Sequence, residues 1–294
     1  MTLKDALLLG RISNLPTVWA NALTGLYLAG FEFSANGGGF FKPALAVLAM
    51  SLFYVGGMYL NDAFDASIDA KARPERPIPS GRVDRRIVFY AGYGLLGSGI
   101  LATLLAALSQ PAVDVFWPGM SGLALAAVII FYDWHHKSNP LGPFVMGVCR
   151  ALVYVTAALC VTLVLPTNVL LAAGIVFCYL IGLSFVAKQE SLGQVRTLWP
   201  LILLAAPLAF GSLHAIGQPW VIMFTILLLA WVAFCVRLIV RGGPLIALAV
   251  ANLIAGIALC DAILLAAAGA TELLLIAAGC FVLTLALQCA VPGT

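Results

Sequence analysis

Three aspartates with helical spacing lie in the stretch Asn61–Asp69, which reads N-D-A-F-D-A-S-I-D. Asp62, Asp65 and Asp69 follow one another at intervals of three and four residues, so a helix presents their carboxylates on one face. Asn61 shares an overlapping stripe of that face. Carboxylates so close together at a membrane boundary repel one another and resist burial, so a cation should neutralise them. Hard oxygen ligands of this type suit Mg²⁺, which proteins hold through one or two carboxylates together with substrate phosphates.

A loop rich in arginine and proline follows the aspartates and reads K-A-R-P-E-R-P-I-P-S-G-R-V-D-R-R over residues 71–86. Its prolines disfavour a continuing helix, and its glycine permits a turn. Arg73 and Arg76 are well placed to bind phosphate oxygens, because guanidinium groups contact them through paired, charge-assisted hydrogen bonds. The acids and the arginines together favour a Mg²⁺–phosphate site. The alternatives are a solvated acidic helix end and a loop whose positive charge only fixes membrane topology.

Hydrophobic segments must position these polar groups. Of the 294 residues, 63% are hydrophobic and only 9% are charged, whereas soluble globular proteins carry about 25% charged residues. The mean hydropathy is +1.08. Repeated apolar segments of roughly 20 residues therefore predict an all-α, polytopic transmembrane bundle, folded as a single domain over residues 1–294. We expect ten spans, or nine if the seventh or the last does not cross, at residues 12–30, 43–63, 86–108, 113–132, 141–164, 168–187, 197–214, 219–240, 245–268 and 271–290.

The basic residues mark one side of this bundle. All but two of the 15 lysines and arginines precede the first segment or follow an even-numbered one. By the positive-inside rule, the N-terminus and these connections face the cytoplasm, which places the aspartate motif at the cytoplasmic surface of a plasma or inner membrane. Arg150 lies inside the fifth segment, where a charge costs about 2.5–3.5 kcal/mol at helix-centre depth. We expect it to face a cavity or an acid and to contribute to the site.

The motif N-D-x-x-D-x-x-x-D followed by R-P-x-R-P-I-P-S-G resembles the signature of the UbiA superfamily of intramembrane prenyltransferases. The resemblance extends to Arg11 and Asn14 in R-I-S-N-L-P-T and to the stretch Tyr132–Lys137. It implies an all-helical bundle of about nine spans, with a central cavity open to the lipid and a polar cap on the cytoplasmic side. It also implies that the aspartate motif binds an isoprenyl diphosphate through Mg²⁺ and that the prenyl chain passes to an acceptor.

The residues and the resemblance agree on a mechanism. Mg²⁺ held by the aspartates takes up charge as the allylic C–O bond breaks, and the apolar cavity keeps water away from the prenyl cation. Lys137 matches a phosphate-facing lysine of the family, and Tyr132 an aromatic position. The partners expected are an isoprenyl diphosphate, an unidentified small or lipophilic acceptor and the lipid bilayer, without nucleic acid. We expect catalytic roles for Asp62, Asp65, Asp69, Lys137 and Glu190, with the three aspartates as metal ligands, and substrate-binding roles for Arg11, Asn14, Asn61, Arg73, Arg76, Tyr132, Arg150 and Lys188.

The third polar loop departs from the family's pattern. Most members carry a second motif, D-x-x-x-D, at the end of the sixth span, and it holds a second Mg²⁺. This chain has S-F-V-A-K-Q-E over residues 184–190, with one acid and no acidic pair. We hypothesise that Lys188 supplies the charge of the second metal and that Glu190 pairs with it or holds a single ion; alternatively, Lys188 is only a topological anchor. The departure resembles the EboC-like members of the superfamily.

Other polar residues allow plainer interpretations. His135 and His136 are adjacent, so on a helix they diverge, and we expect ordinary interfacial residues. Asp133 has a plain partner in Lys137, four residues later. Asp261 lies in mid-span, where we expect it to pair with a basic residue or to be protonated. Two further functions stay open: a UbiA-type terpene cyclase, which shares the ionisation step, and a catalytically silent lipid-binding or transport protein.

Overall fold

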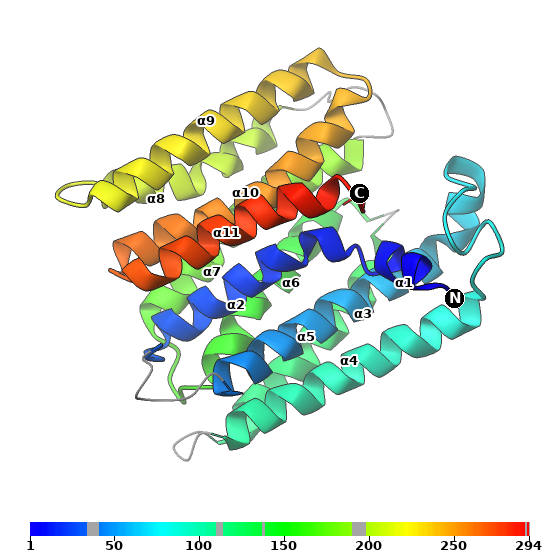
Figure 1. Ribbon diagram of the computed structural model, residues 1–294, viewed down its shortest axis with the longest axis horizontal. Coiled ribbons are helices and arrows are strands. Elements are labelled where there is room, and N and C mark those ends of the chain that lie inside the picture. The colour runs from blue at the N-terminus through cyan, green and yellow to red at the C-terminus, as the bar shows by residue number, and fades with distance from the viewer. Residues whose placement is uncertain (34–40, 110–113, 137–138, 190–197, 292, 294) are drawn as a thin grey trace.

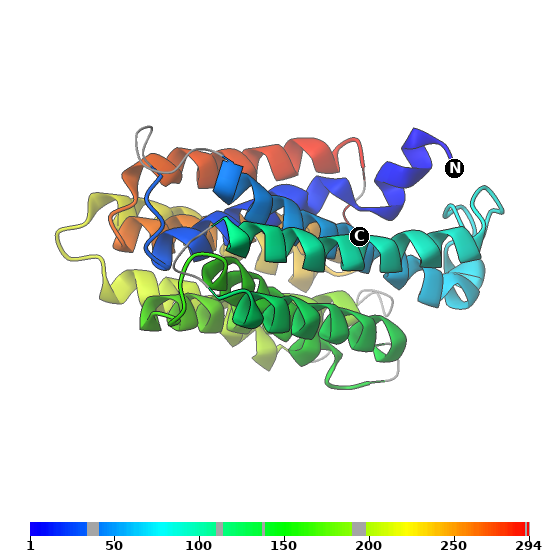
Figure 2. The same ribbon diagram turned by 90° about the horizontal axis from the view of Figure 1, so that it is seen from below.

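The computed structural model describes residues 1–33, 41–109, 114–136, 139–189, 198–291 and 293, and within these ranges the regular elements are helices. The long helices run side by side along one common direction, as Figures 1 and 2 show. The predicted all-α bundle is therefore confirmed. In chain order the helices are α1 (Leu3–Leu9), η1 (Ile12–Asn14), α2 (Leu15–Leu28), α3 (Phe41–Ala72), α4 (Arg85–Leu108), α5 (Phe116–His135), α6 (Gly142–Leu159), α7 (Thr167–Gln189), η3 (Trp199–Ala205), α8 (Ala206–Leu213), α9 (Pro219–Arg241), α10 (Leu245–Ala267) and α11 (Thr271–Gln288).

Eight of the described helices, α3–α7 and α9–α11, are long and apolar enough to cross a membrane. They match eight of the predicted hydrophobic segments. The first predicted segment instead contains η1 and the 14-residue α2, and the seventh divides into η3 and α8. Pro200 and Pro207 lie in the first turns of these last two elements, where the missing N–H of proline is tolerated. The number of helices that cross the bilayer stays a prediction.

Two large hydrophobic clusters fill most of the bundle. One joins α2 to α3–α6 around Phe53 and Leu60. The other joins α6 and α7 to α9–α11 around Tyr179 and Leu253. Helix α2 packs against α3 and α6 on one side and against α10 and α11 on the other, so it links the two halves. Residues at the start of α2 therefore lie at the seam between the halves.

Helix α3 is longer than the hydrocarbon core of a bilayer. Its 32 residues measure about 48 Å at the rise of an α-helix, whereas the hydrocarbon core is about 30 Å thick. The first half of α3 is apolar and packs on α4, and the polar run begins at Asn61. The three aspartates consequently occupy the last turns of α3, at one end of the bundle.

The α3–α4 connection folds back over this end. Helix α3 ends at Ala72, as the following prolines predict, and Gly81 turns the chain with a φ of +75°. Arg82 donates from Nε to Asp5 Oδ1 at 3.0 Å and so ties the connection to α1. Hydrogen bonds from Thr2 and Arg82 lower the pKa of Asp5 to about 2. The connection and α1 thus form one joined layer beside the end of α3.

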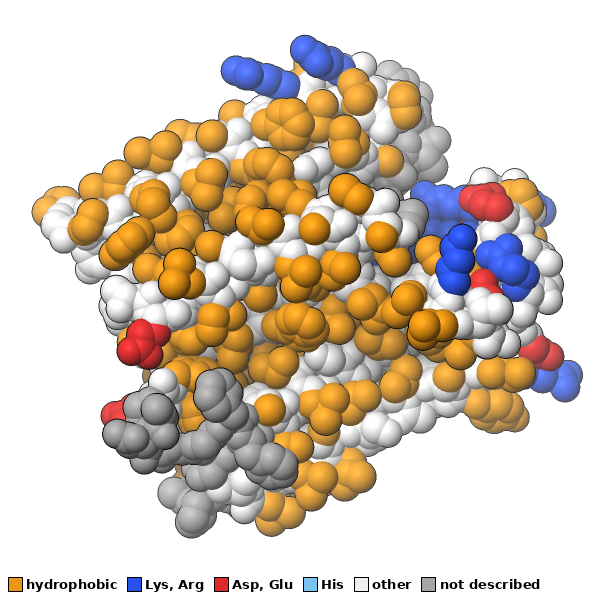
Figure 3. Space-filling model, viewed as in Figure 1, with side chains coloured by type: hydrophobic (Ala, Val, Ile, Leu, Met, Phe, Trp, Pro, Cys, Tyr) orange, Lys and Arg blue, Asp and Glu red, His pale blue; other side chains and the backbone are white. Residues whose placement is uncertain are grey.

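The outer surface of the bundle is apolar between its ends. Figure 3 shows hydrophobic side chains over the flanks of the helices, with lysine and arginine side chains over the α3–α4 connection and at the end of α9. Large apolar residues such as Leu101, Leu123 and Ile226 are exposed on the spans. Apolar side chains of this kind suit contact with lipid tails. The helices also satisfy their own backbone hydrogen bonds, as a lipid environment requires. The chain is an integral membrane protein.

A polar network lies buried where α2, α6 and α10 meet. Asp261, which is 0% exposed, accepts hydrogen bonds from Tyr154 Oη at 2.5 Å and from Asn21 Nδ2 at 2.6 Å. Arg150 donates from Nη1 to Asn21 Oδ1 at 2.9 Å and from Nη2 to Thr17 Oγ1 at 3.3 Å. Asn21 therefore connects the cation expected inside the fifth span with the acid expected inside the ninth.

We predict that Asp261→Ala lowers the free energy of unfolding by about 3 kcal/mol, because it removes the acid that balances Arg150 and leaves Tyr154 and Asn21 without their acceptor. Thermal unfolding of the protein in detergent measures the effect. Glu272→Ala, at an exposed acid in the first turn of α11, is the control. If the two variants unfold at the same temperature, the network does not stabilise the bundle.

Candidate active site

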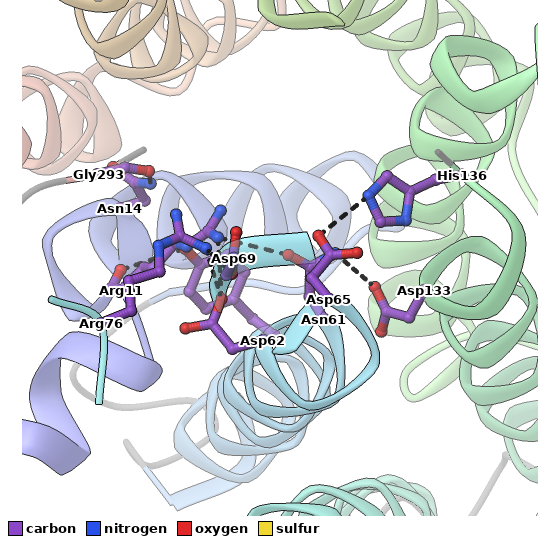
Figure 4. A network of polar contacts seen from close by, with 11 residues as sticks. Arg11, Asn14, Asn61, Asp62, Asp65, Asp69, Arg76, Asp133, His136 and Gly293 are labelled. Carbon is purple, nitrogen blue, oxygen red and sulfur yellow. Dashed lines mark hydrogen bonds and ion pairs between the residues drawn. The ribbon is translucent and has the colours of Figure 1, made fainter. Parts of the chain in front are cut away.

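The three predicted aspartates are all buried at the end of α3, with exposed fractions of 6% for Asp62, 4% for Asp65 and 5% for Asp69. Figure 4 shows that they do not share one partner. Asp62 and Asp69 lie toward two arginines, whereas Asp65 lies toward α5. The acidic face expected from the spacing thus exists. Two of its carboxylates contact arginines, and the third contacts a residue directly after α5.

Two arginines neutralise one part of this face. Arg76 places Nη1 at 2.6 Å from Asp69 Oδ2 and at 3.4 Å from Asp62 Oδ1. Arg11 places Nη2 at 3.1 Å from Asp62 Oδ1 and at 3.4 Å from Asn61 Oδ1. A single network therefore joins five residues that were predicted for the site: Arg11, Asn61, Asp62, Asp69 and Arg76. Each arginine has further N–H groups that can donate hydrogen bonds to a phosphate group.

The position of Arg11 depends on a strained backbone. Arg11 separates α1 from η1 with a φ of +41°, in the left-handed region that a residue with a side chain rarely adopts. The hydroxyl of Tyr54 donates to its carbonyl oxygen at 3.2 Å. Burial lowers the pKa of Arg11, but Asp62, Tyr54 and Tyr132 together raise it by more, so the pKa lies above its usual value. The guanidinium is thus a fixed positive charge.

Helix α5 supplies the other part of the site. His136, directly after α5, places Nε2 at 3.4 Å from Asp65 Oδ2, and its ring stacks on Tyr132 with 4.8 Å between the centroids. Asn61 donates from Nδ2 to Asp133 Oδ1 at 3.2 Å. The end of α5 is therefore held against the end of α3 through polar contacts.

Sequence reasoning missed two of these residues. His136 was expected to be an ordinary interfacial residue, and the structure places its ring against Asp65. Asp133 was expected to pair with Lys137, which lies outside the described residues, and the structure places it on Asn61. The available signal was spacing, since His136 lies four residues after Tyr132 and three after Asp133, the intervals at which helical side chains are neighbours. His135 diverges from His136 as expected and stacks on Phe131.

Two other predicted residues have hydrogen-bond partners other than the aspartates. Asn14 donates from Nδ2 to the carbonyl of Gly293 at 2.8 Å and accepts from Gln288 Nε2 at 3.0 Å, so it holds the C-terminal segment. Lys188 is exposed and donates from Nζ to the carbonyl of Asn139 at 2.6 Å. Their roles toward a substrate stay predictions.

Three further predicted residues are placed only in part or not at all. Arg73 directly follows α3, and its backbone N–H donates to the carbonyl of Asp69 at 2.7 Å. Lys137 and Glu190 lie outside the described residues. The hypothesis that Lys188 and Glu190 replace a second metal site is therefore unchanged as a prediction.

An apolar pocket adjoins the α5 side of the aspartates. It lies between α2, α3, α5 and α6, and most of its wall is hydrophobic. Asp133 and Tyr132 contribute polar groups near the aspartates, and Arg150 contributes one from α6. The pocket is lined by Val18, Met50, Phe53, Tyr54, Gly57, Met58, Leu125, Ile129, Tyr132, Asp133, Met146, Cys149, Arg150 and Val153.

The aspartates fit Mg²⁺ in donor chemistry. Within the described ranges no group of three or more His, Cys, Asp or Glu side chains is arranged so that it could hold a metal ion, so the aspartates do not form a protein-only cage. Mg²⁺ does not need one, because it is usually bound through one or two carboxylates together with waters and phosphate oxygens. Asp62 supplies buried carboxylate oxygens beside arginines that suit a phosphate, and Asp65 supplies a second buried carboxylate three residues further along α3. The residues therefore fit a magnesium ion that arrives with a phosphorylated ligand.

Fold and site define a class of protein: an integral membrane helical bundle in which arginine-bound aspartates adjoin an apolar pocket. Charged and apolar surfaces therefore meet at one place in the bundle. The sequence profile of the UbiA prenyltransferase family matches residues 18–260, and the chain belongs to this family. The resemblance drawn from the aspartate and arginine motifs is thereby confirmed, while the EboC-like subgroup stays a prediction.

Relatives and solved structures agree with this assignment. Digeranylgeranylglyceryl phosphate synthase from Metallosphaera sedula is 35% identical over 109 residues, which cover 37% of this chain and 36% of that protein. A solved structure of a digeranylgeranylglyceryl phosphate synthase aligns with a TM-score of 0.60 at 18% identity, over 95% of this chain and 98% of the other. A UbiA homologue from Archaeoglobus fulgidus, bound to DMAPP and Mg²⁺, aligns with a TM-score of 0.56 at 13% identity, over 86% and 99%. The match to the M. sedula protein spans little more than a third of its length, and the structural matches show the fold.

We predict that Arg76→Gln lowers the unfolding temperature in metal-free buffer, because Asp62 and Asp69 lose their shared counter-charge. Mg²⁺ should then raise the unfolding temperature of this variant more than that of the wild type, since the ion supplies the missing positive charge. Thermal unfolding with EDTA and with Mg²⁺ measures both effects.

The matched control is Arg86→Gln, at an exposed arginine in the first turn of α4. Equal behaviour of the two arginine variants would mean that the ion pairs of Arg76 do not stabilise the aspartates.

Proposed function

We propose that this protein is a Mg²⁺-dependent prenyltransferase that moves an isoprenyl group from an isoprenyl diphosphate to a lipophilic acceptor within the membrane. The observation that carries the proposal is the arrangement of buried aspartates and two arginines beside an apolar pocket. Charged and apolar surfaces meet there as the two parts of an isoprenyl diphosphate require. Membership of the UbiA prenyltransferase family supports it, as do the relatives that synthesise digeranylgeranylglyceryl phosphate.

The aspartates and the arginines would act on the diphosphate. Asp62 and Asp65 would hold Mg²⁺, which supplies positive charge to the diphosphate oxygens when it is bound. Arg11 and Arg76 would donate hydrogen bonds to the same oxygens. These fixed charges stabilise the leaving group as the allylic C–O bond breaks and its electron pair passes to the diphosphate. Asn61 orients the site by contacting both Arg11 and Asp133.

The pocket would hold the prenyl chain. Phe53, Leu125 and Val153 line it with hydrophobic surface in the interior of the bundle. Exclusion of water matters here, because water would react with the allylic cation before the acceptor does. Asp133 lines the pocket and contacts Asn61, the neighbour of Asp62, so the reacting carbon would lie between the diphosphate and the chain.

We also propose that this end of the bundle faces the cytoplasm. The support is the distribution of charge: basic side chains gather over the α3–α4 connection and the end of α9 in Figure 3, and cytoplasmic loops carry an excess of lysine and arginine. The acidic site would then meet soluble diphosphates and Mg²⁺ from the cytoplasm.

We predict that Asp62→Asn and Asp65→Asn each lower prenyl transfer by about 100-fold or more, because each removes a charge that stabilises the departing diphosphate. The assay incubates purified protein with Mg²⁺, labelled isoprenyl diphosphates and a lipid extract of the source cells, and counts label in the lipid fraction. EDTA should abolish transfer by the wild type.

Arg86→Gln serves again as the surface control, and circular dichroism establishes that the aspartate variants are folded. Folded Asp62→Asn and Asp65→Asn proteins with wild-type rates would exclude this site as the active centre.

A further inference from the structure

Two arginines at the end of α9 carry charge that the described part of the chain does not balance. Arg237 and Arg241 are both exposed, and neither makes a hydrogen bond or an ion pair with a described residue. Arginines elsewhere at this end of the bundle do have acidic partners, as Arg76 has in Asp69. The two guanidinium groups of α9 are therefore available to an anion from outside the described chain.

The spacing of these arginines brings them together. Arg237 and Arg241 are four residues apart, so their side chains are neighbours on one helix face, and like charges at this interval destabilise a helix. The helix end does not use their N–H groups, because the carbonyls of Leu238 and Ile239 accept from the backbone N–H of Gly242. The negative end of the helix dipole attracts both cations but leaves these donors free. An anion bound between the arginines would remove their repulsion.

The depth of the arginines matches the surface of a bilayer. Helix α9 has 23 residues and is about 35 Å long, close to the thickness of the hydrocarbon core, which is about 30 Å. Arg237 and Arg241 lie in its last two turns, at the same end of the bundle as the last turns of α3 (Figure 1). They consequently lie where lipid headgroups begin.

An apolar flank continues from the arginines along α9. The helix lies at the edge of the bundle and packs against α8 and α10 (Figure 1). Ile226, Leu229 and Phe234 are exposed on it, and Ile226 shares a face with Arg237, because eleven residues make three turns. Figure 3 shows the basic side chains above this hydrophobic surface. A ligand with an anionic head and apolar chains fits both parts.

We propose that Arg237 and Arg241 bind the phosphate of one anionic phospholipid, whose acyl chains lie along the exposed flank of α9. Guanidinium groups bind phosphate oxygens through paired, charge-assisted hydrogen bonds, and two neighbouring groups can bind one phosphate. The net negative charge of the lipid complements the pair, whereas a zwitterionic headgroup adds a cation that the arginines repel. The site is on a different helix from the aspartates, so the inference does not depend on prenyl transfer.

The test variant is Arg237→Gln/Arg241→Gln, and the matched control is Arg86→Gln, at an exposed arginine in the first turn of α4. Each protein is purified in nonionic detergent and titrated with phosphatidylglycerol, with phosphatidylcholine or with inorganic phosphate. Native mass spectrometry counts the bound lipids, and thermal unfolding measures their effect on stability. Circular dichroism establishes folding, and Arg241→Gln alone continues the test if the double variant does not fold.

We expect the wild type and Arg86→Gln to retain one phosphatidylglycerol in preference to phosphatidylcholine. The double variant should bind phosphatidylglycerol about 25-fold more weakly, since a basic residue near an anionic headgroup contributes about fivefold. Phosphatidylglycerol should raise the unfolding temperature of the wild type and the control more than that of the double variant. Inorganic phosphate should not reproduce this effect, because it lacks the chains that contact α9.

Three results would overturn the inference. The wild type would bind both lipids equally, or the double variant and Arg86→Gln would lose phosphatidylglycerol to the same extent, as a general attraction of surface charge predicts. Alternatively, inorganic phosphate would stabilise the wild type as much as phosphatidylglycerol does, which would make the ligand a soluble anion. None of these results bears on the proposed prenyl transfer, which is measured in its own assay.

Discussion

The ion pairs between two arginines and the aspartates of α3 are the interactions on which the polar end of the bundle depends. Arg76 shares one nitrogen between Asp62 and Asp69, and Arg11 reaches Asp62 from the segment before α2. Buried carboxylates at a membrane boundary require a counter-charge. The two arginines supply it and join the α3–α4 connection and the N-terminal segment to α3. Stability and chemistry therefore depend on the same few side chains.

The proposed function makes use of the same ion pairs. The guanidinium groups contact the carboxylates in this structure; with a magnesium diphosphate, the metal would bind Asp62 and Asp65, and the phosphate oxygens would bind Arg11 and Arg76. One set of ion pairs replaces another, so little buried charge is left unpaired in either state. The apolar pocket next to Asp133 gives the prenyl chain a place in the same bundle.

The sequence predicted the parts of this arrangement that follow from one helix and its adjoining loop. The spacing of the aspartates placed them on one face of α3, and Arg76 follows within the next turn and loop. Contacts between helices that are far apart in the sequence could not be predicted in the same way. The rotation of α5 decides that His136 meets Asp65, and packing across the bundle sets that rotation. The change from a 3₁₀-helix to an α-helix between η3 and α8 was also missed, because hydrophobic length does not distinguish the two kinds of helix.

The most direct test of the account is an experimental structure of the protein with Mg²⁺ and an unreactive isoprenyl thiodiphosphate. The account predicts metal density between the diphosphate and the carboxylates of Asp62 and Asp65, with Arg11 and Arg76 on the diphosphate oxygens. The prenyl chain should lie in the pocket between Asp133 and Val153. Diphosphate bound away from these aspartates, or a chain lying outside the pocket, would contradict it.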